Sequence, residues 1–133
     1  MGKSLTKEQI YQAMPSAFRV ALRILDAWDF SPGDMALVLG LGSAECQRYQ
    51  ATGLPEESMS EDLTTRVSLI LGIELALETL LREEGDIRDW VNRPSNAPIF
   101  QGATPKSVML HGPLDDLRGI RMYLDGWLSG DFA

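Results

Sequence analysis

The chain has 133 residues, 44% of them hydrophobic, and a formal net charge of −7. This length suits one domain, or two very small ones that share a core, and no apolar run approaches the roughly 20 residues of a membrane span. A negative balance argues against strong autonomous nucleic-acid binding, because such binding depends mainly on neutralising phosphates.

The first predicted elements are helices. Thr6-x-x-Gln9 is a capping box that opens a helix. Pro15 is expected to end or kink that helix, or to lie in the first turn of the next one. Apolar residues at helical spacing continue to residue 28, and Arg19 and Arg23 share one face of this segment.

Two short helices are predicted next. Ser31 followed by Pro32 indicates an N-cap, and the helix that it opens ends at Gly40. Ser43 can cap a further helix over residues 44–51. The spacing of a small residue, Ala36, then Gly40, and then Cys46 is typical of a helix-turn-helix. The alternative is a helical hairpin that only builds the core.

The longest predicted helix begins at a second capping box, Ser58-x-x-Glu61, and reaches about residue 84. Its apolar residues cover far more than the usual arc of a surface helix. It is therefore expected to be a core helix and a shared interface, which predicts a homodimer. Glu74 interrupts the apolar stripe, and a buried acid there would need a partner.

The C-terminal part begins with a short helix over residues 86–91. A loop rich in proline and asparagine follows, and Thr104 before Pro105 opens another helix, which Gly112 and Pro113 close. The last helix is predicted over residues 114–128, with an apolar stripe that includes Trp127. The chain is thus predicted to be all-α, with a helix-turn-helix and dimerisation region at residues 1–84 and a second region at 85–133.

The charge pattern narrows the candidate DNA-contacting residues. Residues 55–86 contain nine acidic residues and two arginines, so this segment accounts for the entire net charge of −7. The segments before and after it each have a formal net charge of zero. The neutral N-terminal part leaves room for a small basic face. The predicted DNA-binding residues lie on the second helix of the pair and on the preceding helix: Ser43, Glu45, Gln47, Arg48, Arg19 and Arg23.

We find no pattern that indicates an enzyme. His111 is the only histidine and Cys46 the only cysteine, and neither has a second soft ligand nearby, so neither a metal nor another cofactor is expected. Cys46 fits the small apolar position of the helix pair, and His111 is expected at a helix C-terminus. A lone cysteine and the lack of a leader sequence favour a cytoplasmic location.

The order of these parts resembles the Xre/MbcA/ParS-type antitoxins of bacterial toxin–antitoxin operons. The resemblance to their C-terminal toxin-binding domain rests on a motif within residues 90–105 and on a second stretch at residues 119–124. The motif residues are Trp90, Pro94, Asn96, Phe100, Gly102 and Pro105. The N-terminal part is similar to the Xre-like helix-turn-helix region of the same proteins.

The resemblance implies a partner, a RES-domain toxin that consumes NAD⁺, whose active-site entrance the antitoxin blocks. It also implies that the bacterial operon is repressed by the antitoxin, or by its complex with the toxin, through the helix-turn-helix region. The same resemblance implies that the toxin-blocking tail consists of Trp127, Ser129, Gly130, Asp131, Phe132 and Ala133. Trp90 and Trp127 have an alternative role, which is to pack in the core of this chain.

Two other functions remain open from the residues. The chain could be a dimeric helix-turn-helix transcription regulator without a toxin partner, or a structural adaptor that does not contact DNA. Alanine substitution of Gln47 and Arg48 separates these possibilities. An unchanged operator affinity would mean that the second helix of the pair does not recognise the operator DNA.

Overall fold

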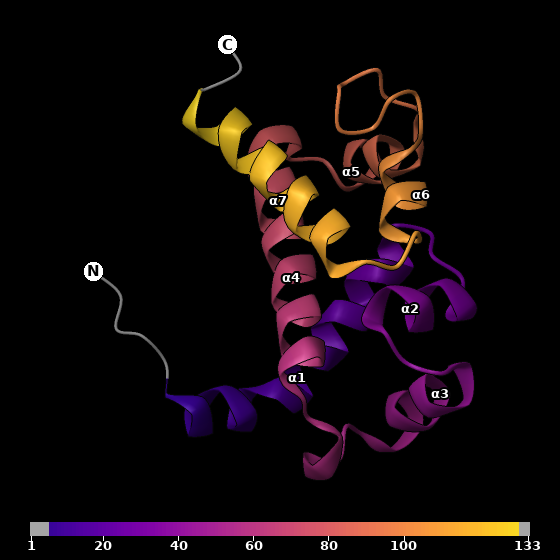
Figure 1. Cartoon of the computed structure of the whole chain (residues 1–133), viewed down its shortest axis with the longest axis vertical. Coiled ribbons are helices and arrows are strands. Elements are labelled where there is room, and N and C mark those ends of the chain that lie inside the picture. The colour runs from indigo at the N-terminus through magenta and orange to yellow at the C-terminus, as the bar shows by residue number, and fades with distance from the viewer. Residues whose placement is uncertain (1–5, 131–133) are drawn as a thin grey trace.

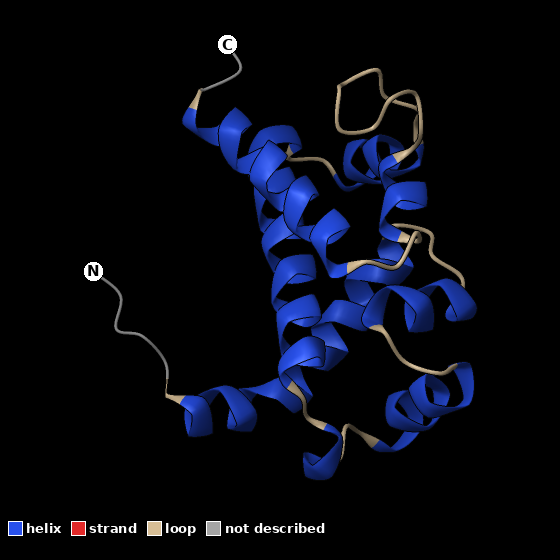
Figure 2. Cartoon of the chain, viewed as in Figure 1, coloured by secondary structure: helices blue, strands red, loops and turns tan. Residues whose placement is uncertain are grey.

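A computed structural model describes residues 6–130, apart from the side chains of Lys7, Ile10 and Tyr11. Every regular element in this range is a helix, so the fold is all-α, as predicted (Figures 1 and 2). The elements in chain order are α1 (Lys7–Ala27), α2 (Pro32–Leu39), α3 (Ser43–Thr52), the 3-10 turn η1 (Glu56–Ser58), α4 (Glu61–Leu81), α5 (Glu84–Asn92), α6 (Pro105–Met109) and α7 (Leu114–Ser129).

Three helix starts lie where their capping residues predict them. The Thr6 hydroxyl accepts a hydrogen bond from the Gln9 amide at the start of α1. The hydroxyls of Ser31 and Thr104 accept equivalent bonds at the starts of α2 and α6. Each side chain satisfies an amide that has no partner within its helix, which fixes where the helix begins.

The prediction that Pro15 ends a first helix is wrong, because α1 continues through it. Proline removes one backbone hydrogen bond from a helix interior. Met14 and Phe18, which flank it, are buried in the core. Tertiary packing of this face therefore offsets the local penalty.

The start and end of α4 also differ from the prediction. Its N-cap is Ser60, whose hydroxyl accepts from the Leu63 amide, whereas the Ser58 hydroxyl lies 2.7 Å from the Tyr49 hydroxyl. The helix ends at Leu81 because Arg82 has a positive φ of 71°. Similarly, α3 begins at Ser43 itself, with Gly42 as the N-cap.

The longest interior helix, α4, packs against both α1 and α7 (Figure 1). One contiguous cluster of buried residues runs from Met14 to Leu124 and includes both predicted regions of the chain. Leu117, Ile120 and Leu124 of the predicted α7 stripe are buried, whereas Trp127 is 51% exposed. The predicted boundary between residues 84 and 85 falls at the start of α5 and stays a prediction.

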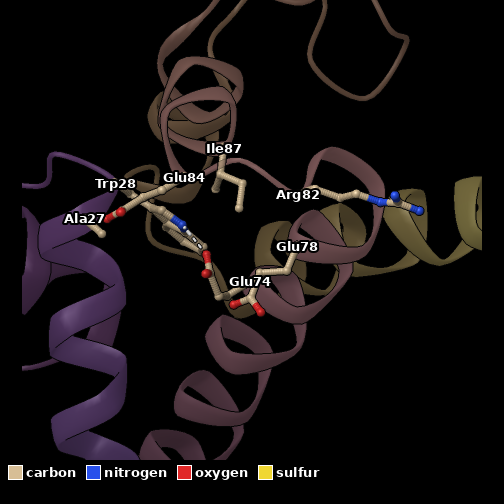
Figure 3. Close-up of a pocket in the computed structure, with 7 residues that line it drawn as sticks. All are labelled: Ala27, Trp28, Glu74, Glu78, Arg82, Glu84 and Ile87. Carbon is tan, nitrogen blue, oxygen red and sulfur yellow. Dashed lines mark hydrogen bonds between the residues drawn. The ribbon is translucent and has the colours of Figure 1, made fainter.

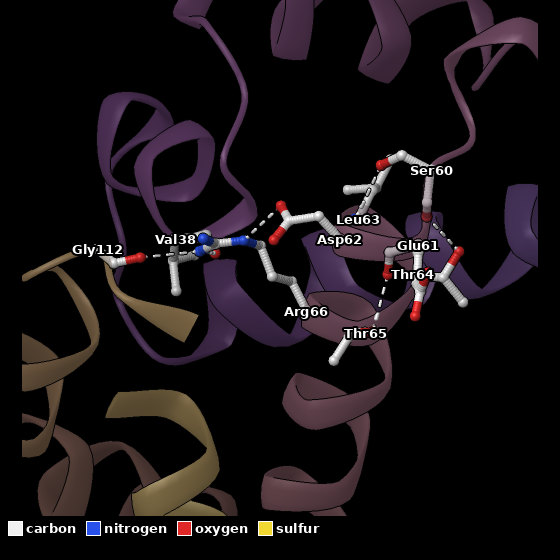
Figure 4. Close-up of polar contacts among 9 residues, drawn as sticks. All are labelled: Val38, Ser60, Glu61, Asp62, Leu63, Thr64, Thr65, Arg66 and Gly112. Atoms are coloured by element: carbon white, nitrogen blue, oxygen red, sulfur yellow. Dashed lines mark hydrogen bonds and ion pairs between the residues drawn. The ribbon is translucent and has the colours of Figure 1, made fainter. Parts of the chain in front are cut away.

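Polar side chains from α4, α5 and α6 donate hydrogen bonds to backbone carbonyls near the C-terminal ends of α1 and α2. The Arg66 guanidinium of α4 donates to the carbonyl oxygens of Val38 and Gly112 and pairs with Asp62 (Figure 4). Asn92 donates to the Trp28 carbonyl, and Lys106 donates to the Asp29 carbonyl. These bonds satisfy carbonyls that the helices leave without partners, and they fix α2 relative to the C-terminal segments.

Candidate functional site

The α2–α3 pair is held together by small buried residues. Gly40 takes a left-handed conformation, with φ of 70°, and the Leu41 amide donates to the Ala36 carbonyl at 2.9 Å. Ala36 and Cys46 are both buried. Burial raises the pKa of the Cys46 thiol, so this side chain is neutral at ordinary pH and packs as a small apolar group.

The outward face of α3 carries most of the predicted DNA-binding residues. Ser43, Gln47 and Arg48 are exposed, and the Arg48 guanidinium lies 5.4 Å from the centroid of the Tyr49 ring. Glu45 is placed differently. One of its carboxylate oxygens accepts from the Gly42 amide and the other from the Tyr49 hydroxyl, so this side chain is used within the fold.

A groove of about 510 Å³ separates this face of α3 from α1. Its lining residues are Arg19, Leu22, Arg23, Asp26, Met35 and Gln50. Within residues 6–130, neither arginine lies within ion-pair distance of a carboxylate. The sequence analysis did not single out Gln50, although its position seven residues after Ser43 places it on the same face of α3.

A second groove, of about 590 Å³, lies at the other end of the molecule and is mainly apolar. The 97–99 segment forms one wall and α7 forms the other: it is lined by Ala97, Pro98, Ile99, Gly119, Met122, Tyr123 and Trp127. A Cβ atom at Gly119 would lie 3.2 Å from Ile99, so the glycine allows the loop to approach the helix closely. Met122 is 71% exposed at the rim.

A chain of aromatic contacts supports this apolar groove from inside. Trp90 contacts Phe100, Phe100 contacts Tyr123 and Tyr123 contacts Trp127, with ring centroids 5.7, 5.5 and 6.0 Å apart. The first two contacts are edge-to-face, which is a favourable geometry for aromatic pairs. Trp90 is half-buried and packs against the core, which agrees with the alternative prediction that it packs within this chain.

The remaining motif residues shape the loop itself. The Gly102 amide donates to the Ser95 carbonyl, the Ser95 amide donates to the Ala103 carbonyl, and Gly102 has φ of 89°. Pro105 is buried at the start of α6, whereas Pro94 and Asn96 are exposed. In the predicted tail, Ser129 and Gly130 are exposed, and Asp131, Phe132 and Ala133 lie outside the described residues.

A third pocket, of about 530 Å³, contains a carboxylate held by a tryptophan (Figure 3). The Trp28 indole nitrogen donates to Glu74 at 2.9 Å, which supplies the partner that this acid was predicted to need. Burial, a hydrogen bond with Glu78 and the charges of Glu78 and Glu84 raise the pKa of Glu74 to about 7. The bond from Trp28 acts in the opposite direction.

No family model matches the chain. The uncharacterized protein y4oB of Sinorhizobium fredii (strain NBRC 101917 / NGR234) is 31% identical over 118 residues, which cover 88% of each chain. The chain belongs to the same family as y4oB. The match extends over most of the chain.

Residues 6–130 contain no group of three or more acidic, histidine or cysteine side chains placed to hold a metal ion. No helix in the same range is long and apolar enough to span a membrane. His111 lies just after the α6 cap residue Leu110, with its ring nitrogen 3.7 Å from Asp116.

Proposed function

We propose that this chain is the antitoxin of a type II toxin–antitoxin system. It is a homodimer without enzymatic activity, which neutralises a RES-type, NAD⁺-consuming toxin by occluding its active site, and which represses its own operon through α3. One observation carries the proposal. Two surfaces of unlike chemistry, the polar face of α3 and the apolar groove beside α7, lie at opposite ends of the molecule (Figure 1).

The apolar groove supports the half of the proposal that concerns the toxin. It contains exposed Met122 and half-exposed Trp127, and these residue types are enriched at the centres of protein interfaces. An exposed apolar surface of this kind commonly marks a site where another protein binds. The groove also adjoins the loop that resembles the toxin-binding domain of the antitoxin family.

The α3 face supports the half that concerns DNA. Its exposed side chains are polar, and the guanidinium groups of Arg19 and Arg23 lie beside it without carboxylate partners in the described chain. The acidic excess belongs to residues 55–86, a separate segment of the sequence. Residues 1–54, which include α3 and both arginines, have a formal net charge of zero, which is more favourable to phosphates than the net charge of −7 of the whole chain.

Co-expression with the product of the adjacent gene tests the proposal. We expect a stable complex that co-purifies and that has lost the NAD⁺-degrading activity of the free toxin. Met122→Glu places a charge at the rim of the apolar groove, so it should weaken the complex and restore toxin activity. Leu37→Glu is the matched control, because Leu37 is also 50% exposed but lies on α2, outside the groove.

Two results would count against this function. If the chain forms no complex with the neighbouring product, the antitoxin assignment is wrong, and specific operator binding by the isolated chain would then favour a regulator without a toxin. If Met122→Glu and Leu37→Glu weaken the complex equally, the toxin does not bind at the groove beside α7.

A further inference from the structure

The exposed surface of α3 is divided into two sides of different composition. Ser43, Gln47 and Gln50 follow one another at spacings of four and three residues, so they lie in one row along the helix. This row adjoins the groove that Gln50 shares with α1. The other exposed side carries Arg48 and ends at Thr52, whose hydroxyl donates to the Arg48 carbonyl.

The row of Ser43, Gln47 and Gln50 contains no charged side chain. Glu45 is half-buried, and its carboxylate accepts hydrogen bonds from the Gly42 amide and the Tyr49 hydroxyl. The Arg48 guanidinium lies over the Tyr49 ring, at 5.4 Å, which places its charge at the flank of the helix. The row therefore presents two carboxamides, one hydroxyl and the neighbouring methyl groups of Ala44 and Ala51, both exposed.

The arginines occupy the edges of this surface. Arg19 and Arg23 line the groove on the α1 side, one helical turn apart, and Arg48 lies on the opposite flank of α3. Asp26, one turn beyond Arg23, lines the same groove and disfavours a phosphate at that end. Guanidinium groups on both edges suit the two sugar-phosphate strands that border a DNA groove, and the uncharged centre suits base edges.

Base recognition follows from the chemistry of the centre. A glutamine carboxamide pairs in bidentate fashion with N6 and N7 of adenine, whereas guanine is read mainly by arginine or lysine and cytosine by acidic side chains. Alanine methyl groups contact the thymine methyl. We infer that α3 reads A·T base pairs in the major groove through Gln47 and Gln50, while Arg19, Arg23 and Arg48 hold phosphates. This inference rests on the DNA binding included in the proposed function.

Selection from a library of random duplexes, with the full chain and with its co-purified complex, tests this reading. We expect enriched sites with A·T pairs at two positions of each half-site. Gln47→Ala and Gln50→Ala should each reduce discrimination at one position by about 5- to 100-fold, with little change at the others. Arg23→Ala should instead weaken binding to every duplex alike and lower the salt dependence by about one counterion.

Gln12→Ala is the matched control, because Gln12 is an exposed glutamine on α1 that does not line the groove. Selected sites rich in G·C, or an A·T preference that survives both glutamine substitutions, would overturn the inference and leave DNA binding intact. Failure of both the chain and its complex to retain any duplex would overturn the DNA binding itself. Melting temperatures equal to that of the wild type exclude misfolding as the cause of any loss.

Discussion

The groove at the α3 end of the molecule is lined by charged side chains, whereas the groove at the α7 end is not. Beside α3, the guanidinium groups of Arg19 and Arg23 have no carboxylate partner in the described chain. The residues that line the groove beside α7 include no charged side chain. Unpaired cations suit a polyanion, whereas an uncharged, mainly apolar lining suits a protein surface. One small helical core thus supports two surfaces that fit different classes of partner.

The largest expected effect comes from removing the aromatic support of the α7 end. Phe100 is buried between Trp90 and Tyr123, so Phe100→Ala leaves a cavity beneath the groove. We expect the free energy of unfolding to fall by about 3–5 kcal/mol in urea denaturation. Met122→Ala, at the exposed rim, should change it by no more than about 0.5 kcal/mol. Equal losses in the two variants would mean that the aromatic chain does not support the groove.

The boundaries of α2 were predictable because their signals are local. An N-cap at Ser31, a proline after it and a left-handed glycine at position 40 each act within a few residues, and all three are found as predicted. The loop before α6 is different. Its shape depends on contacts between Trp90, Phe100 and Tyr123, which lie on separate elements, and residue spacing alone does not define such contacts.

The error at the start of α4 has this origin. Ser58 satisfies the sequence rule for a capping box, but its hydroxyl lies 2.7 Å from that of Tyr49 on α3, and Ser60 caps α4 instead. The competing partner comes from another helix, so it is known only once the helices are placed.

A second prediction concerns the connection between the two ends. Arg66 is only 12% exposed, and its guanidinium donates to the last turn of α2 and to the segment before α7. Arg66→Met leaves the carbonyls of Val38 and Gly112 without this donor. We expect a loss of about 2 kcal/mol in the free energy of unfolding. Arg118→Met, at an exposed ion pair with Asp115, should cost well under 1 kcal/mol; similar losses in both would refute a bridging role for Arg66.

The Glu74 carboxyl gives a smaller, pH-dependent prediction. Its pKa in the folded chain is raised to about 7, so the folded state binds this proton more tightly than the unfolded state does. The resulting stabilisation is complete below about pH 4.5 and is lost as the pH rises through 7. Glu74→Gln keeps an uncharged side chain beside Trp28, so the melting temperature should gain more at pH 8 than at pH 5.5. The exposed Glu57→Gln should show no such difference, and a pH-independent shift for Glu74→Gln would contradict the raised pKa.

The smallest effect on folding is expected for a substitution on α4. The same substitution tests whether the molecule has a third functional surface besides the α3 end and the α7 end. Leu75 is 64% exposed on α4, and the exposed Ser68 and Thr79 lie on the same side of the helix, two turns before it and one turn after it. If the proposed homodimer forms through this face, the molecule has a third functional surface. Leu75→Glu should change the stability of the monomer by no more than about 0.5 kcal/mol. It should nevertheless shift the mass measured by light scattering from dimer to monomer, since a buried unpaired charge opposes association. A dimer that survives Leu75→Glu but dissociates on Leu37→Glu would place self-association at the α2–α3 end, where it would align two copies of α3 directly for a two-fold operator.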